Sequence, residues 1–367
     1  MNKMIFSNLL HRPVRSVISV VAIGVEVTLI LLMVGLATGL LNDSRMRQQG
    51  LGADVIVLPP GASFLTGLSG APVSIKVADV LRRLPHVAAV APIIFQTNTS
   101  KTVEVIYGID LASFQALGGP FHYLAGGPFA GPDSIIVDDY FARSKNVHVG
   151  DFLPLLNHSF RVCGIVEQGR GARKFLPIST LQDMIGAQGK ASVFYAKLDN
   201  PGNANLVVDE IKNIPGMQTY SVRSMADYLS MYTVGNMPGL SSFISVVVGV
   251  AMVIGFIVIF QAMYTAVMER TREIGILKSL GASRMYIVNV ILRETLLLAI
   301  AGIIFGVVLS YTARAGIVGS IPTLRVIVPR VWIVYAAIIA IIGAMLGAIY
   351  PAVKAARKDP IDALAYE

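Results

Sequence analysis

Charged residues are scarce in this sequence, at 14% of its 367 positions, whereas 54% of the positions are hydrophobic. Soluble domains normally carry about 25% charged residues, so the chain as a whole does not fit a single water-soluble domain. Cysteine is scarcer still, because Cys163 stands alone and excludes an internal disulfide. Any part of the chain outside a membrane must therefore be stable through its own hydrophobic core.

Four apolar runs are long enough to cross a bilayer as helices, which takes about 20 residues. These runs lie at 17–41, 243–267, 287–311 and 331–350, and nothing between Asn42 and Leu240 qualifies. The intervening stretch has the short alternating strands and polar turns of a soluble fold. We therefore predict four transmembrane helices with a large α+β extracytoplasmic domain of two lobes inserted between the first and the second.

These patterns give a complete division of the chain. We predict an N-terminal cytoplasmic segment at 1–16, transmembrane helices at 17–41, 241–267, 285–313 and 331–350, an extracytoplasmic domain at 42–240, a cytoplasmic helix and turn at 268–284, a short outer loop at 314–330 and a cytoplasmic tail at 351–367.

The net charge of +8 belongs almost entirely to the predicted membrane part. Residues 42–240 contain sixteen Lys and Arg against fifteen Asp and Glu, and the rest of the chain contains fourteen against seven. Basic residues precede the first span, separate the second from the third and follow the fourth, which places all three groups in the cytoplasm. Both termini are therefore predicted to be cytoplasmic, the first span is an uncleaved anchor, and no nucleic-acid partner is expected.

The predicted outer domain shows the elements of a mixed fold but no pattern of a catalytic or metal site. Strands are expected at 54–58, 102–108, 134–137, 152–156, 160–166 and 193–197, helices at 77–84 and 203–214, and a joint between two lobes at 118–133. Its histidines, His86, His122, His148 and His158, lack the spacing of metal ligands. We expect neither an enzyme nor a metal site.

The segment MERTREIGILKSLGASR at 268–284 predicts a short helix outside the bilayer, because charged and apolar residues alternate over three turns. Gly281 is placed to end this helix in the left-handed conformation, and Ser283 is placed to cap the next one. Ile274, Leu277 and Leu280 are expected to form an apolar ridge. From these residues alone, the helix either docks a partner or merely links two spans.

The same segment resembles the signature loop of the MacB/FtsX-like permeases of ABC transporters. The ending YPAVKAARKDPIDALAYE at 350–367 is similar to the C-terminus of that family, and SIIVDDYFARSKNVHVGDFLPLLNHSFRVCGIVE at 134–167 is similar to its second outer lobe. The order of one span, an outer domain and three spans also matches. MacB-type proteins carry a fused ATPase domain that is absent from this sequence, so the resemblance implies a separate permease subunit.

The resemblance implies partners and a location. ATP and Mg²⁺ would bind to a cytoplasmic ATPase subunit, and this chain would need no cofactor of its own. We expect two permease copies in a bacterial plasma (inner) membrane, in contact with the surrounding lipids. We also expect an outer partner such as a membrane-fusion protein. The expected ATPase-coupling residues are Glu269, Arg270, Arg272, Glu273, Ile274, Gly275, Leu277, Lys278 and Gly281.

Glu26 lies inside the first predicted span, where an ionised carboxylate is unfavourable. It is expected to pair with an inward-facing group, to line a substrate groove, or to bind a ligand such as haem together with Met33, since some family members export haem. The alternative is a protonated or hydrogen-bonded carboxyl that holds helices together. Arg293 and Glu294, early in the third span, favour a structural ion pair or snorkelling side chains.

Three spans contain pairs of glycines four residues apart, which let helix backbones approach closely. They are Gly35 and Gly39, Gly302 and Gly306, and Gly343 and Gly347. Such pairs are typical either of a homodimer built on the first span or of packing within one subunit, and the sequence leaves both open.

By the family resemblance, ATP hydrolysis would drive export or extraction of an amphiphilic cargo, such as a lipid, lipoprotein, haem, drug or peptide, by mechanical transmission to the outer domain. The alternative is an FtsX-like signalling scaffold that activates a cell-wall hydrolase, and a third hypothesis is an ATP-independent receptor or anchor. Exporter and scaffold share the same ATPase contact, so only the outer partner distinguishes them.

Overall fold

The computed structural model describes residues 13–62, 71–98, 104–237, 239–320 and 324–358. It contains two compact units, which we describe one at a time. The described residues of 1–40 and 239–367 form a helical unit, and the described residues of 41–238 form an α/β unit. The predicted assignments for 1–12 and for 359–367 lie outside the described residues.

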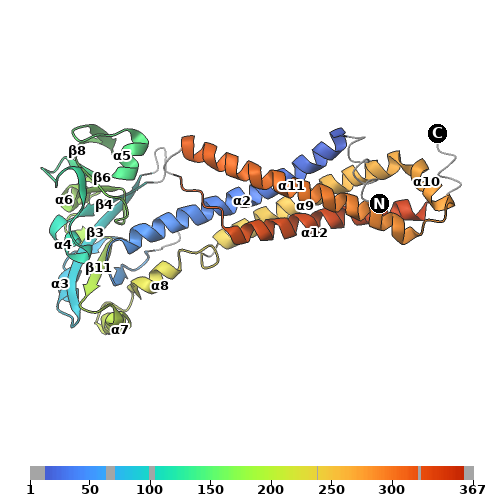
Figure 1. Cartoon of the computed structure of the whole chain (residues 1–367). Helices are drawn as coiled ribbons and strands as arrows, with labels where there is room; N and C mark the ends of the chain where they lie inside the picture. The colour runs from blue at the N-terminus through green and yellow to red at the C-terminus, as the bar shows by residue number, and fades with distance from the viewer. Residues whose placement is uncertain (1–12, 63–70, 99–103, 238, 321–323, 359–367) are drawn as a thin grey trace. The chain divides into compact units, whose positions relative to one another are not determined.

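Four helices of the described chain are long and apolar enough to cross a membrane. They are α2 (Pro13–Gln49), α9 (Leu240–Glu269), α11 (Arg284–Ser320) and α12 (Arg330–Arg357), with the short α10 (Thr271–Ser279) between α9 and α11 (Figure 1). The four predicted spans are therefore confirmed. Their ends differ, because α11 includes residues 314–320, which the sequence pattern assigned to a loop, and α12 continues through residues assigned to the tail.

Within the helical unit, α12 packs along both α9 and α11. The face that it buries is built from small residues spaced four apart, including Ala336, Ala340, Ala344 and Ala348. A Cβ atom added to Gly347 would lie 2.8 Å from the carbonyl oxygen of Phe256 in α9. Small side chains thus bring the backbones of α12 and α9 together, as is common where membrane helices associate.

α2 and α11 cross at glycines. A Cβ atom on Gly306 would lie 2.6 Å from the carbonyl oxygen of Gly24, and one on Gly302 would lie 2.6 Å from the Cβ of Ile23. The Thr28 hydroxyl of α2 also lies 3.0 Å from the carbonyl oxygen of Gly306, to which it donates. Gly302 and Gly306 therefore pack within the subunit.

The described part of the chain between α11 and α12 lies on α2. Residues 324–329, which we call the strap, have no regular secondary structure, and Val326 and Val328 of the strap are buried. The N–H of Ile327 donates to the carbonyl oxygen of Gly35 at 3.0 Å. Gly39 lies so close to the backbone of Arg325 that a Cβ atom there would overlap its carbonyl oxygen. Gly35 and Gly39 thus hold the strap of their own subunit.

The α/β unit is organised around a ten-stranded sheet with the order β12-β1-β11-β3-β4-β9-β6-β8-β5, in which β7 also pairs with β8. Its strands are β1 (Val55–Leu58), β3 (Val87–Asn98), β4 (Glu104–Ile109), β5 (Tyr123–Gly126), β6 (Ser134–Asp138), β7 (Phe152–Leu155), β8 (His158–Val166), β9 (Lys174–Pro177), β11 (Val193–Leu198) and β12 (Ser221–Ser224). A separate pair consists of β2 (Val73–Ser74) and β10 (Lys190–Ala191). The parallel pair β4–β9 joins the two halves, so the predicted lobes share one sheet.

Helices cover this sheet and form three hydrophobic clusters with it. They are α3 (Val77–Arg82), α4 (Leu111–Gly118), α5 (Asp139–Lys145), α6 (Ile178–Met184), α7 (Ala204–Asn213) and α8 (Met225–Ser230). α4 and α8 contribute to one cluster, α3 and α7 to another, and α5 and α6 to the third. The predicted α+β class is confirmed. The helix expected from Asn203 begins at Ala204 after a short 3₁₀ turn (Pro201–Asn203), and Asn203 makes no capping hydrogen bond.

Candidate functional site

α10 is separated from the next helix by a sharp turn whose two caps are formed by local residues. Gly281 has φ of 93°, and the N–H of Ala282 donates to the carbonyl oxygen of Leu277 at 3.0 Å, the pattern of a left-handed helix end. The hydroxyl of Ser283 accepts a hydrogen bond from the N–H of Tyr286 at 3.2 Å and caps α11. Both predicted caps are confirmed.

Two basic residues tie the ends of α10 to other helices of the unit. Arg270, which precedes α10, forms an ion pair of 3.2 Å with Glu294 of α11, and both side chains are largely buried. Lys278, near the end of α10, donates from Nζ to the carbonyl oxygen of Ala356 at 3.1 Å and to that of Lys358. Arg270 and Lys278 therefore make contacts inside the subunit, and the structural ion pair expected near Glu294 has Arg270 as its partner. Arg293 is exposed.

The outward face of α10 carries both charged and large apolar side chains. Arg272 and Glu273 are exposed, Ile276 is 44% exposed and Leu280, the residue after the helix, is 79% exposed. Glu269, the last residue of α9, is also exposed. Apolar and charged side chains thus lie together on the side of α10 that does not pack against the other helices.

The apolar ridge differs from the prediction. Ile274 packs against the core of the helical unit, and Ile274 and Leu277 both line an apolar cleft between α10, the end of α9 and the start of α11. Gly275 is buried as well. The side of α10 that carries Ile274, Gly275 and Leu277 lies against the other helices. The exposed side of α10 therefore differs from the predicted one, and Ile276 is exposed where Ile274 was expected to be.

Glu26 is buried in the helical unit, with 5% of its surface exposed. Its Oε1 atom has no hydrogen-bond partner among the described residues, and neither does the buried hydroxyl of Ser19, seven residues earlier on α2. Pairing with an inward-facing group was one of several roles that the sequence left open, and the described residues provide no such partner for Oε1. Met33 is half-buried.

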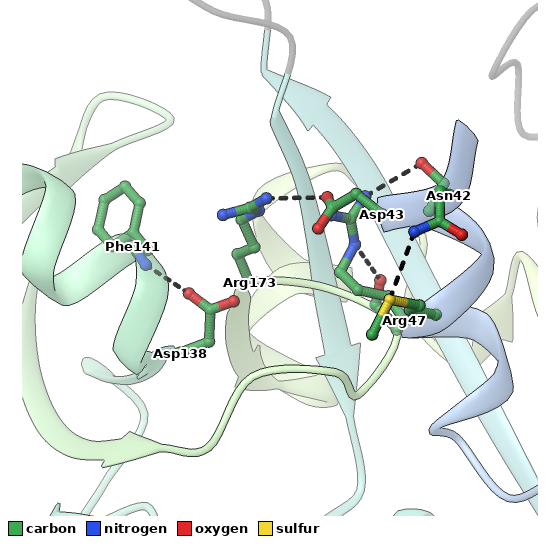
Figure 2. Close-up of polar contacts among 9 residues, drawn as sticks. Asn42, Asp43, Arg47, Asp138, Phe141 and Arg173 are labelled. Carbon is green, nitrogen blue, oxygen red and sulfur yellow. Dashed lines mark hydrogen bonds and ion pairs between the residues drawn. The ribbon is translucent and has the colours of Figure 1, made fainter. Parts of the chain in front are cut away.

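The last turns of α2 belong to the α/β unit and are bound to it by a buried polar cluster. Figure 2 shows Asp43 of α2 between two arginines: Arg47, one turn further along α2, and Arg173, which comes just before β9. The Arg173 Nη2 atom lies 2.9 Å from the Asp43 carboxylate. The guanidinium of Arg173 also lies over the ring of Tyr140, 4.3 Å from its centroid.

Further contacts fix the end of α2 to two parts of the α/β unit. The N–H of Gly171 donates to the carbonyl oxygen of Arg47 at 2.8 Å. The amide of Gln48 donates to the hydroxyl of Tyr107 at 3.1 Å and accepts from that of Tyr195 at 2.9 Å. The end of α2 is thus fixed both to the loop before β9 and to the central strands.

Asp138 lies next to this cluster and caps α5. Its carboxylate accepts a hydrogen bond of 2.7 Å from the N–H of Phe141 (Figure 2). The N–H of Asp138 donates to the carbonyl oxygen of Arg173 at 2.9 Å. Burial raises the pKa of Asp138 to about 6, although the Phe141 N–H and the charge of Arg173 act in the opposite direction. The cap therefore titrates well above the usual range of an aspartate.

Sequence reasoning missed this cluster. Asp43 and Arg173 are 130 residues apart, and no local pattern links them. The only available signal is the i,i+4 spacing of Asp43 and Arg47, which is typical of a helix that continues beyond the apolar run.

Two families of known domains match the chain. Residues 16–214 match the family described as MacB-like periplasmic core domain, and residues 245–360 match the family described as FtsX-like permease C-terminal. The first match alone covers more than half of the chain. This chain belongs to the MacB/FtsX-like permease family. The resemblance predicted from the segment 268–284 and from the order of the spans is therefore confirmed, and the family is one of ABC transporter permeases.

Two sequence relatives agree with this assignment. The macrolide export ATP-binding/permease protein MacB of Shewanella sp. (strain W3-18-1) is 25% identical over 385 residues, which cover 97% of this chain and 59% of that protein. The ABC transporter permease YknZ of Bacillus subtilis is 33% identical over 128 residues, covering 35% of this chain and 32% of YknZ. The crystal structure of the periplasmic region of MacB from Actinobacillus actinomycetemcomitans covers 52% of this chain and 97% of its own, with 17% identity and a TM-score of 0.39. The chain thus spans less than two thirds of the length of the curated MacB proteins that it matches.

Proposed function

We propose that this chain is the membrane subunit of an ATP-driven export or extraction machine, in which a separate cytoplasmic ATPase docks on α10 and thereby moves the α/β domain outside the membrane. The chain itself would be non-catalytic, with ATP and Mg²⁺ bound by the ATPase. The cargo would be amphiphilic, as macrolides are in the MacB relatives.

The observation that carries this proposal is the outward face of α10. It exposes Ile276 and Leu280 beside Arg272 and Glu273, while Arg270 and Lys278 tie its ends to the transmembrane helices. A helix that is exposed on one side and held at both ends can bind a partner and pass on its movement. The apolar residues would be buried in a groove of the ATPase, and the charges would fix the register.

The proposed orientation places α10 in the cytoplasm and the α/β domain outside. Basic residues around α10 and α12 support it, because such residues are retained on the cytoplasmic side. Two permease copies are proposed as well, since the four candidate spans leave half or more of their most apolar windows unburied within one subunit. That surface is available to lipid and to a second copy.

The binding test uses the chain co-expressed with the ABC ATPase that co-purifies with it. Glu273→Lys and Leu280→Asp should each weaken ATPase binding about tenfold or more, as loss of a central contact does, and should leave the fold intact. Leu206→Asp is the matched control, because Leu206 is a leucine of the α/β unit that is 50% exposed on a helix. Unchanged binding by both α10 variants would overturn the proposal.

A second test addresses the orientation. In a Cys163→Ala background, Ser279→Cys on α10 and Lys145→Cys on the α/β unit introduce thiols at exposed positions. A membrane-impermeant maleimide added to intact cells should label position 145 and should reach position 279 only after the membrane is opened. Labelling of position 279 in intact cells would place α10 outside and end the ATPase assignment.

A further inference from the structure

Lys278 connects α10 to the end of α12, at residues 78 and 80 positions further along the chain. Its ammonium group donates to the carbonyl oxygens of Ala356, at 3.1 Å, and of Lys358, where α12 ends. The last carbonyl groups of a helix lack partners within the helix, and the helix dipole favours a cation there. The ammonium of Lys278 satisfies both conditions, so it joins α10 firmly to the end of α12.

The other end of α12 is connected to α2 by the strap. Pro329, the last residue of the strap, directly precedes α12, and Val328 is buried in the same core cluster as the alanines of α12. The strap is held on α2 by the hydrogen bond from Ile327 to Gly35 and by the close approach of Arg325 to Gly39. Movement of α12 along its axis would therefore pull on α2 at these two glycines.

We infer that α12 carries the movement of α10 to α2, with Lys278 and the strap as its two attachments. α12 packs along α9 and α11 through alanine and glycine, and such close packing resists bending and transmits displacement. α2 in turn continues into the α/β unit, where Asp43 and Arg173 hold its end. Lys278 is thus a positioning residue of the transmission and not a contact of the ATPase. This inference rests on the proposed function, since it takes the ATPase as the source of the movement.

Amide hydrogen exchange of the whole chain in complex with its ATPase tests the inference, because one experiment reads both ends of the path. Protection of residues 271–279 on ATPase binding reports docking. The difference in exchange of residues 41–49 with and without a non-hydrolysable ATP analogue reports arrival of the movement at the far end of α2. Lys278→Met should retain the first signal and reduce the second to less than a fifth of its wild-type size. Lys278→Arg should restore it.

Two further variants keep the test specific. Arg357→Met removes an exposed cation from the same last turn of α12 and should leave both signals unchanged. Gly39→Ala forces the strap away from α2 while leaving α10 untouched, and should also retain docking and lose the nucleotide-dependent signal in residues 41–49.

The outcomes separate failure of the inference from failure of the proposed function. If the ATPase does not protect residues 271–279 of the wild-type chain, the proposed function fails. If docking occurs but residues 41–49 do not respond to nucleotide, or if they still respond fully in Lys278→Met and Gly39→Ala, α12 is not the route. Loss of docking in Lys278→Met would make Lys278 an ATPase contact and would overturn the inference as well.

Discussion

The carboxyl group of Glu26 in α2 lies directly against Gly255 in α9, so closely that a Cβ atom at position 255 would overlap Oε2. The glycine therefore provides the space into which a buried acidic side chain fits. The contact explains how a carboxyl is accommodated between two transmembrane helices, because the charge-bearing atoms are turned away from the lipid.

Gly255→Ala should lower the free energy of unfolding by about 1 kcal/mol, the low end for overpacking, because the added methyl group displaces the end of the flexible Glu26 side chain. In a Glu26→Ala background the same substitution should be almost neutral, since the carboxyl that it meets is gone. Gly249→Ala is the control, because nothing lies within 4 Å of a Cβ atom at that position. Thermal unfolding in detergent of the wild-type chain, the two single variants and the double variant measures the coupling between positions 26 and 255. Equal losses from Gly255→Ala in both backgrounds would show that the contact is absent.

The four membrane helices could be predicted from the sequence, because each segment in a bilayer must satisfy its own backbone hydrogen bonds as a helix and is recognised from its own apolar residues. The caps at Gly281 and Ser283 were predictable for a similar reason, since a cap depends only on residues within one turn. The far end of α2 was not predictable, because residues 42–49 are polar and are held in place by Arg173, Gly171 and two tyrosines that come much later in the chain.

The orientation of α10 shows the same limit. Alternating charges and aliphatic residues predict an amphipathic helix, but Ile274 and Ile276 are equally apolar, and only packing against α9 and α12 decides which of them turns inward. Predicting this face requires the tertiary contacts that Arg270 and Lys278 make with α11 and α12. As a result, the sequence identified the segment as an amphipathic helix but did not show which of its apolar residues face inward.

This orientation is itself testable by paired truncations on α10. Ile274→Ala removes a half-buried side chain from the core and should reduce the free energy of unfolding by about 1–2 kcal/mol. Ile276→Ala removes an exposed side chain and should change stability by no more than about 0.5 kcal/mol, while weakening ATPase binding. Thermal unfolding and ATPase co-purification of both variants check the assignment, and a reversed pattern would mean that α10 is rotated from the orientation found.

The cluster at the end of α2 should be one of the most sensitive points of the α/β unit. Asp43→Asn leaves two largely buried guanidinium groups without their carboxylate, and such a loss typically costs about 3 kcal/mol. Arg173→Met should cost less, since Asp43 retains Arg47. Asp79→Asn is the control, because the Asp79–Arg82 pair is exposed and contributes about 0–0.5 kcal/mol. Urea unfolding compares the three, and equal effects of Asp43→Asn and Asp79→Asn would argue against a clamp.

Asp138 makes the stability of the α/β unit dependent on pH. Its pKa is raised from 3.8 to about 6, so between these values the folded state binds more protons than the unfolded state. Stability therefore decreases as pH rises through this window, by an amount on the order of 3 kcal/mol. Asp138→Asn keeps an oxygen that can accept from the Phe141 N–H but does not ionise.

Asp138→Asn and the wild-type chain should therefore be about equally stable near pH 4, and Asp138→Asn should be the more stable near pH 7. Asp138→Ala, which removes the cap, should lose about 1 kcal/mol at pH 4 and so separates the role of the cap from the role of the charge. Other titrating groups are shared, so the difference between unfolding curves measured from pH 4 to pH 8 isolates this carboxyl. A wild-type chain more stable than Asp138→Asn at pH 7 would mean that the ionised carboxylate is favoured by Arg173 more than it is penalised by burial.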